Sequence, residues 1–263
     1  MNSDLSLNEA TRIALLAMAD EELILGHRDS EWTGHSPILE EDIALSNIAQ
    51  DEIGHSLVWL TLFEEMGGKN PDAMGFERSP KDFTCAHFVA YPRGDFAYTV
   101  ARQFFYDHQE VVRLKGLLGS SNDRIRSAAE RILREESYHI LHSDSLFERL
   151  AQGTSESRDR MRLAVDRAFP QALGLFESTP AEMTLVDAGV VRANASLVLD
   201  WVREIQPILA RNGITIPVKS GASGVTFECK PDYGGRFGKH STELESVVAD
   251  MQSVYQLAPG GRW

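Results

Sequence analysis

The chain has 263 residues, of which 43% are hydrophobic and 25% are charged, a composition typical of a globular protein with a sizeable core. Its formal net charge of −13 argues against a nucleic-acid partner, because phosphates require a basic face. Cys85 and Cys229 lie far apart without metal-type spacing, which is typical of a reducing compartment. The apolar run IALLAMA is followed directly by acidic residues and is too short to span a membrane. The sequence therefore predicts a soluble, cytoplasmic protein that binds neither membranes nor nucleic acid.

Helical periodicity dominates the sequence, and glycine and proline residues mark the boundaries between its segments. Residues 67–93 form a long connection between the second and third helices. Residues 213–239 are predicted to be irregular, because the alternating run VTFECK (225–230) is too isolated to build a sheet. The predicted helices span residues 8–28, 39–66, 94–118, 122–151, 155–176, 183–212 and 240–257.

Two Glu-x-x-His motifs interrupt otherwise apolar helical stripes. The first pairs Glu52 with His55 in QDEIGH, and the second pairs Glu136 with His139 in REESYHILHS. Residues three apart share one face of a helix, so each pair can present a carboxylate and an imidazole to one point. One such motif is close to chance in a chain of this length, but two that face the core favour a cation held between the helices, which would compensate the buried carboxylates.

A dimetal carboxylate site in a four-helix bundle also needs one carboxylate from each of the two other helices. The first helix offers Glu22, which precedes Glu52 by 30 residues, and the third offers Asp107, which precedes Glu136 by 29 residues. In a helical hairpin, about 13 residues out and about 13 back, plus a short loop, return the chain to the same height. The predicted metal ligands are therefore Glu22, Glu52, His55, Asp107, Glu136 and His139.

Two of these choices have alternatives in the sequence. Glu21 precedes Glu22 but points about 100° away around the helix, and Glu110 lies one turn beyond Asp107. His27 and His108 are candidates to contact the ligand side chains without binding the metal themselves.

The predicted fold is an all-α, ferritin-like four-helix bundle with one long crossover and additional C-terminal helices. The chain is predicted to be a single domain, residues 1–263, with a core bundle at about 8–151 and extension helices at about 155–257. A ligand set of carboxylates and imidazoles suits a di-iron centre, and manganese is an alternative. Catalytic residues are not assigned by the sequence. An apolar substrate pocket would be lined by residues such as Phe104, Phe105, Trp59 and Ile140, although an apolar stripe at helical spacing is more often plain core packing.

Several long stretches resemble the PaaC-type subunit of bacterial phenylacetyl-CoA epoxidase. They include LILGHRDSEWTGHSPILEEDIALSNIAQD, GDFAYTVARQFFYD, YHILHSDSLFERLAQGTSESRDRM and the C-terminal GGRFGKHSTELESVVADMQSVYQLAPGGRW. The resemblance covers nearly the whole chain. It implies a ferritin-like bundle in a multicomponent monooxygenase that epoxidises the ring of phenylacetyl-CoA with dioxygen. The implied partners are a PaaA-type catalytic subunit, a reductase that supplies electrons, and a small accessory subunit.

The chain departs from the PaaC pattern at the predicted metal ligands. The resemblance implies that PaaC-type subunits have apolar or amide residues where QDEIGH stands, whereas QDEIGHSLVW is similar to the PaaA-type motif. Two hypotheses follow: the chain keeps a working di-iron site, or it is a non-catalytic scaffold for a PaaA-type subunit with unused ligands. A ferritin-like iron-binding protein is a third alternative.

An aromatic-CoA thioester substrate would also need basic residues for its phosphates. None of the basic residues forms a recognisable phosphate loop. The candidates are Arg93, Arg102, Arg113, Lys115, Arg124 and Arg126.

Overall fold

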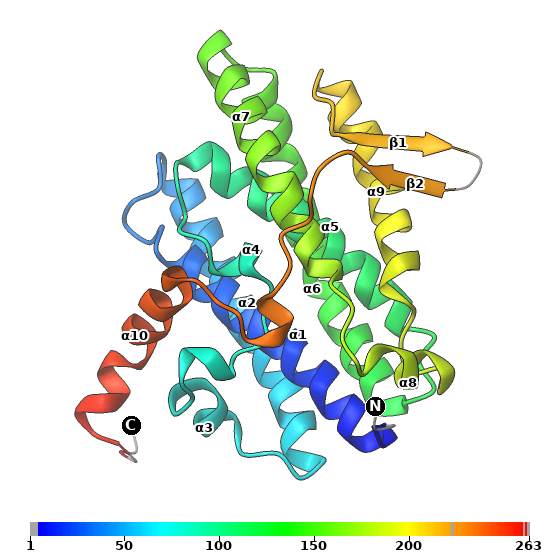
Figure 1. The fold of residues 1–263 in the computed structure, drawn as a ribbon. Helices are drawn as coiled ribbons and strands as arrows, with labels where there is room; N and C mark the ends of the chain where they lie inside the picture. The colour runs from blue at the N-terminus through cyan, green and yellow to red at the C-terminus, as the bar shows by residue number, and fades with distance from the viewer. Residues whose placement is uncertain (1–4, 222–223, 260, 262–263) are drawn as a thin grey trace. The chain divides into compact units, whose positions relative to one another are not determined.

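The computed structural model describes residues 5–221, 224–259 and 261, and it confirms that the protein is mostly helical with a ferritin-like fold (Figure 1). Residues 1–4, 222–223, 260 and 262–263 of the predicted domain lie outside the described residues. The described chain divides into two compact units. Unit 1 comprises residues 1–92, 179–184 and 234–263, and unit 2 comprises residues 93–178 and 185–233.

Unit 1 is built on a hairpin of two long helices, α1 (Leu7–Ser30) and α2 (Leu39–Glu65), which pack along each other. A capping box begins α1: the Ser6 hydroxyl accepts from the Glu9 amide at 3.3 Å, and the Glu9 carboxylate accepts from the Ser6 amide at 3.1 Å. The predicted long connection contains short helices, and the C-terminal helix packs against α1. The connection contains α3 (Pro71–Phe76), η1 (Pro80–Asp82) and α4 (His87–Ala90). The C-terminal part of the unit contains η3 (Gly235–Phe237) and α10 (Thr242–Leu257).

Unit 2 is built on a second helical hairpin, α5 (Phe96–Leu117) and α6 (Asp123–Ala151). Asp95 caps α5 by accepting from the Tyr98 amide, and Asn122 caps α6 by accepting from the Arg124 and Ile125 amides. Two further helices, α7 (Ser155–Ala172) and α9 (Asn194–Arg211), pack against α5. The unit also contains η2 (Leu173–Phe176), part of α8 (Glu182–Asp187, which straddles the unit boundary) and a small antiparallel hairpin of β1 (Val218–Gly221) and β2 (Gly224–Phe227).

Two predictions about the C-terminal half were wrong. The continuous helix at 183–212 is broken between α8 and α9, because Gly189 adopts a φ of +68° and the Val190 amide bonds back to the Leu185 carbonyl. A left-handed glycine followed by such a bond is a common helix ending. The segment 213–239 was predicted to lack a sheet, yet Val218 pairs with Phe227 in the β1–β2 hairpin.

Candidate metal-binding residues in two helical hairpins

In unit 1, the predicted ligands lie on the two helices of the α1–α2 hairpin. Glu22 and Glu52 are completely buried, and His55 is 2% exposed. Gly26 permits the close approach of the helices at this level, because a Cβ there would lie 2.9 Å from the Ala49 carbonyl oxygen and 3.1 Å from the Glu52 Cβ. The hairpin therefore buries Glu22 from α1 together with one Glu-x-x-His pair from α2, and α1 also buries Asp20, Glu21 and Asp29.

The Glu22 carboxylate is held by a tryptophan of the facing helix. Trp59 is fully buried, and its indole Nε1 donates to Glu22 Oε1 at 3.0 Å. The sequence suggested Trp59 only as an apolar lining residue, so its polar role was missed.

Glu21, the alternative to Glu22, lies in a different environment. Its carboxylate forms an ion pair with Arg236, with 2.7 Å between Glu21 Oε1 and Arg236 Nη2, and both side chains are buried. Arg236 comes from the segment just before α10 and also donates weakly, at 3.4 Å, to the Ala17 and Thr84 carbonyls. The two neighbouring glutamates of α1 thus have different partners, a cation for Glu21 and a neutral indole for Glu22.

In unit 2, the predicted ligands lie on the α5–α6 hairpin. Asp107, Glu136 and His139 are completely buried, and His139 Nδ1 lies 3.1 Å from Glu136 Oε1. Gln103, one turn before Asp107 on α5, donates from Nε2 to Asp107 Oδ1 at 2.9 Å. This hairpin thus buries Asp107 from α5 together with one Glu-x-x-His pair from α6, and α5 also buries Glu110.

The pKa of Asp107 is raised to about 8. Burial is the main cause, because it penalises the charged carboxylate, and the nearby Glu136 adds to it. His139, a hydrogen bond from Ser143 and His108 act in the opposite direction but do not cancel the effect of burial. A bound cation would favour the ionised carboxylate at neutral pH.

Glu110, the alternative to Asp107, forms an ion pair with Arg113 three residues later on the same helix. Both side chains are buried, with Arg113 8% exposed. As in unit 1, the alternative carboxylate is matched with an arginine, whereas the predicted ligand accepts a hydrogen bond from a neutral donor.

The two histidines suggested as secondary contacts behave differently. Burial lowers the pKa of His108, but its hydrogen bond to Asp144 (3.0 Å) and its ion pair with Glu204 (3.9 Å between His108 Nδ1 and Glu204 Oε2) raise it by more, so the net pKa is raised. Burial lowers the pKa of His27, and the charge of Glu31 only partly offsets this. His108 therefore binds to α6 and α9 carboxylates, and the charged neighbour of His27 is Glu31, which is not a predicted ligand.

Several of the basic residues suggested for CoA phosphates are buried or form ion pairs within unit 2. Arg102 is completely buried in α5, Arg113 pairs with Glu110, and Lys115 Nζ lies 3.3 Å from Glu204 Oε1. The sequence left the phosphate-binding residues unassigned, and the structure argues against the candidates Arg102 and Arg113, because buried guanidinium groups cannot reach a phosphate in solvent.

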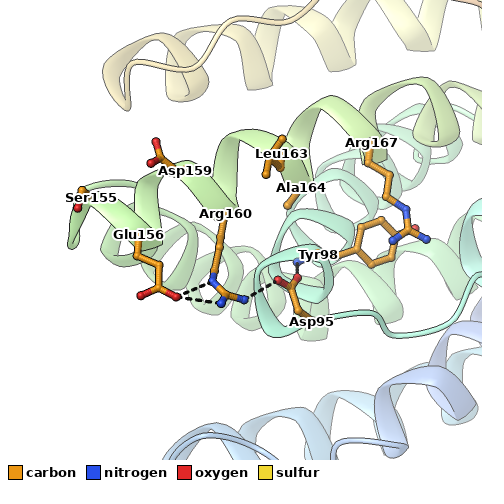
Figure 2. Close-up of a pocket in the computed structure, with 9 residues that line it drawn as sticks. All are labelled: Asp95, Tyr98, Ser155, Glu156, Asp159, Arg160, Leu163, Ala164 and Arg167. Carbon is orange, nitrogen blue, oxygen red and sulfur yellow. Dashed lines mark hydrogen bonds and ion pairs between the residues drawn. The ribbon is translucent and has the colours of Figure 1, made fainter.

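A groove of about 730 Å³ lies between the start of α5 and α7 (Figure 2). Arg160 bridges its own helix and α5, with 2.9 Å to Glu156 and 3.3 Å to Asp95. Arg167 lies over the Tyr98 ring (Figure 2), and its Cζ atom is 4.2 Å from the ring centroid. The charges that line this groove largely pair with one another, so it does not resemble an anion-binding site.

The two phenylalanines expected to line a substrate pocket, Phe104 and Phe105, belong to the core of unit 2. Phe104 stacks on Phe147 with 4.4 Å between ring centroids, and Phe105 packs against Phe169 and Trp201. All of them are fully buried. Their helical spacing is accounted for by packing alone.

Sequence reasoning missed three residues that contact the predicted site: Trp59, Gln103 and Arg236. Gln103 had a local signal, because it precedes Asp107 by four residues and therefore shares its helix face. Arg236 follows Glu21 by more than 200 residues, so no periodic pattern could have paired them. Trp59 lies on the same helical stripe as Glu52 and His55, but the stripe alone does not indicate which acceptor its indole N–H contacts.

Comparisons with known proteins agree with the resemblance seen in the sequence. The family model for "Phenylacetic acid catabolic protein" matches residues 4–263. The chain is 28% identical over 258 residues to the C-subunit of 1,2-phenylacetyl-CoA epoxidase from Escherichia coli (strain K12), covering 98% of this chain and 100% of that protein. Its fold is similar to that of a Synechococcus protein with aldehyde deformylating oxidase activity, with a TM-score of 0.57 at 14% identity, covering 80% of this chain and 95% of that one.

Within the described part of the chain, no helix combines the length and the apolar character that crossing a bilayer would require. The match to the family model extends across both helical hairpins and the C-terminal segment. The chain belongs to the phenylacetic acid catabolic protein family.

Proposed function

We propose that this protein is part of a multicomponent phenylacetyl-CoA epoxidase that acts in phenylacetate catabolism. Its family membership and its match to the C-subunit of that enzyme, along the full length of the relative, support this role. The proposed reaction is the dioxygen-dependent epoxidation of the aromatic ring of phenylacetyl-CoA. The proposed partners are a PaaA-type catalytic subunit and a reductase.

The proposal includes a di-iron centre in this chain. The observation that supports it is the repeated composition of the two hairpins, each of which buries a predicted carboxylate ligand on one helix, Glu22 or Asp107, and a Glu-x-x-His pair on the other. Ferritin-like dimetal proteins use this combination, two single carboxylates and two Glu-x-x-His motifs projecting inward. The proposed ligands are Glu22, Glu52, His55, Asp107, Glu136 and His139.

The chemistry of these residues fits a pair of divalent metal ions. Four carboxylates and two imidazoles suit iron, and manganese as well. Glu52, His55 and Glu136 each offer one buried ligand atom of a kind that holds a metal ion. The arginine partners of Glu21 and Glu110 favour Glu22 and Asp107 as the ligands, because a carboxylate already paired with a guanidinium is a poorer ligand.

When bound, a di-iron centre would supply the redox chemistry with dioxygen that ring epoxidation requires. The residues of this chain would hold the metals and keep water away from the carboxylates, since all six ligand side chains are buried. The cost of burying several carboxylates would be offset by the metal charge.

A second candidate function is a scaffold that holds a PaaA-type catalytic subunit. The outward side of α2 carries exposed apolar side chains, which favours a partner protein. Their exposed fractions are 69% for Leu39, 53% for Ile43, 37% for Ile53 and 53% for Leu57.

The experiment that tests the proposal is elemental analysis of the protein expressed with iron supplementation. It is compared with a Glu52→Gln, Glu136→Gln double variant and with a Glu135→Gln control, because Glu135 is exposed and adjacent to Glu136. We expect about two irons per chain in the wild type and the control, and fewer than half as many in the double variant. Far-UV circular dichroism checks that all three proteins are folded.

Metal near zero in a folded wild-type protein would refute the di-iron centre. If that protein still bound a PaaA-type subunit and supported epoxidation by the complex, the scaffold function would replace the metal-binding one. If it did neither, the proposed role in the epoxidase would be refuted too.

A further inference from the structure

Each of the two single carboxylates of the proposed centre, Glu22 and Asp107, accepts a hydrogen bond from a buried neutral donor. Glu22 accepts a hydrogen bond from the indole Nε1 of Trp59 at 3.0 Å, and Asp107 accepts one from the amide Nε2 of Gln103 at 2.9 Å. Both donors are buried, with Trp59 fully buried and Gln103 2% exposed. Each hydrogen bond joins one carboxylate oxygen to a neutral N–H group.

The alternative ligands Glu21 and Glu110 have positively charged partners. Glu21 is paired with Arg236, and Glu110 is paired with Arg113. An arginine neutralises a carboxylate, whereas an indole or amide donor orients it without adding a positive charge. The hydrogen bonds from Trp59 and Gln103 therefore orient Glu22 and Asp107 without themselves supplying a positive charge that would compete with a metal ion.

The positions of the two donors determine which oxygen of each carboxylate is left to face a metal ion. The Trp59 and Gln103 bonds go to Glu22 Oε1 and Asp107 Oδ1. A hydrogen bond to one oxygen restricts rotation of the carboxylate about its last torsion, which is otherwise broad. The second oxygen of each group is then held in one direction before a metal arrives.

We propose that Trp59 and Gln103 are positioning residues for the metal-binding carboxylates Glu22 and Asp107. This inference rests on the proposed dimetal centre and extends it to residues that do not contact the metal. Hydrogen-bonded partners of metal ligands orient those ligands, and their loss typically weakens metal binding by about 10–100-fold. The two residues act alike although one lies in each helical hairpin.

The test uses substitutions that remove the N–H donor but keep most of the buried volume, Trp59→Phe and Gln103→Met. Two controls remove the same chemical groups elsewhere. Trp201→Phe removes a fully buried indole that donates to the Phe105 carbonyl at 3.1 Å, and Gln109→Met removes a buried amide from α5. The controls therefore separate the loss of a buried polar group from the loss of ligand orientation.

Binding of Co²⁺ to the full-length, metal-free proteins is measured by titration calorimetry, and the visible absorption spectrum of each cobalt-loaded protein is recorded. We expect each test variant to bind Co²⁺ roughly 10–100-fold more weakly than the wild type and to show shifted absorption bands, because its carboxylate geometry has changed. We expect the controls to match the wild type in affinity within about threefold and to have the same spectrum, because neither removes a donor that orients a proposed ligand. A merely structural role would lower the melting temperature of tests and controls alike without moving the cobalt spectrum.

Tight Co²⁺ binding with an unchanged spectrum in either test variant would overturn the assignment of that residue while leaving the dimetal centre in place. Failure of the wild type itself to bind Co²⁺ would overturn both this inference and the metal-binding part of the proposed function. Because Gln103→Met makes a smaller change to the core than Trp59→Phe, it decides the outcome if the tryptophan variant does not fold.

Discussion

Replacing Arg236 with methionine is expected to destabilise the protein strongly, because Glu21 would remain buried without its cation. Glu21 is completely buried and the Arg236 side chain is 8% exposed, with 2.7 Å between Arg236 Nη2 and Glu21 Oε1. Removing one partner of a buried ion pair typically costs about 3–5 kcal/mol, since the other charge loses its compensation. For a chain of this size, that loss corresponds to a decrease in melting temperature of roughly 6–20 °C.

The assay is urea-induced and thermal unfolding of the metal-free protein, followed by far-UV circular dichroism. The matched control is Arg160→Met, which breaks an ion pair of similar length, 2.9 Å between Arg160 Nη2 and Glu156 Oε1, on the surface. Its side chains are 57% and 74% exposed, so we expect a much smaller loss of unfolding free energy than for Arg236→Met, because solvent screens exposed ion pairs.

A double variant, Glu21→Met with Arg236→Met, distinguishes charge compensation from packing. Replacing both partners of a buried pair by apolar side chains is often close to neutral, so we expect the double variant to recover at least half of the lost stability. The reasoning would be refuted if Arg236→Met cost no more than Arg160→Met, or if the double variant were less stable than the single one.

Three further outcomes follow from the structure. Gly235→Ala is expected to lower the unfolding free energy by about 1–3 kcal/mol, because a Cβ there would collide with the Cys85 carbonyl oxygen. Gly54→Ala, in an open part of α2, is expected to raise the unfolding free energy by about 0.5–1 kcal/mol. Thermal melts that reversed this order would contradict the packing described. The folded-state pKa of Asp107, about 8, lies above its ordinary 3.8, so the folded protein retains a proton that the unfolded chain loses, and the stability of the metal-free protein should fall as the pH rises from about 4 to about 8. Asp107→Asn should therefore become increasingly stable relative to the wild type across that range in urea unfolding, and a difference independent of pH would refute the assigned pKa.

The parts of the fold and site that the sequence predicted depend on local periodicity. Residues three apart share a helix face, so the Glu52–His55 pair could be recognised without knowing what surrounds it. Glu22 followed from the length of a helical hairpin, which returns the chain to the same height. The chain's long helices made both inferences possible, because each extends over several turns.

The parts that the sequence could not predict depend on contacts between distant segments or on single backbone conformations. Nothing in the sequence near Glu21 indicates that Arg236 neutralises it. The break before α9 depends on the left-handed conformation of Gly189, and the β1–β2 hairpin consists of two strands of four residues each, too short for a clear alternating pattern. Trp59 was assigned to an apolar stripe, and the direction of its indole N–H is determined only by the packing of α1 against α2.

The most direct test of the proposed metal centre is an anomalous-difference map at the iron absorption edge, measured from crystals of the iron-loaded protein. We predict two peaks within coordination distance of the six proposed side chains, with Glu22 and Asp107 as ligands and Glu21 and Glu110 on their arginines. Peaks bound by Glu21 or Glu110, or no peaks in crystals that contain iron in solution, would contradict the proposed centre.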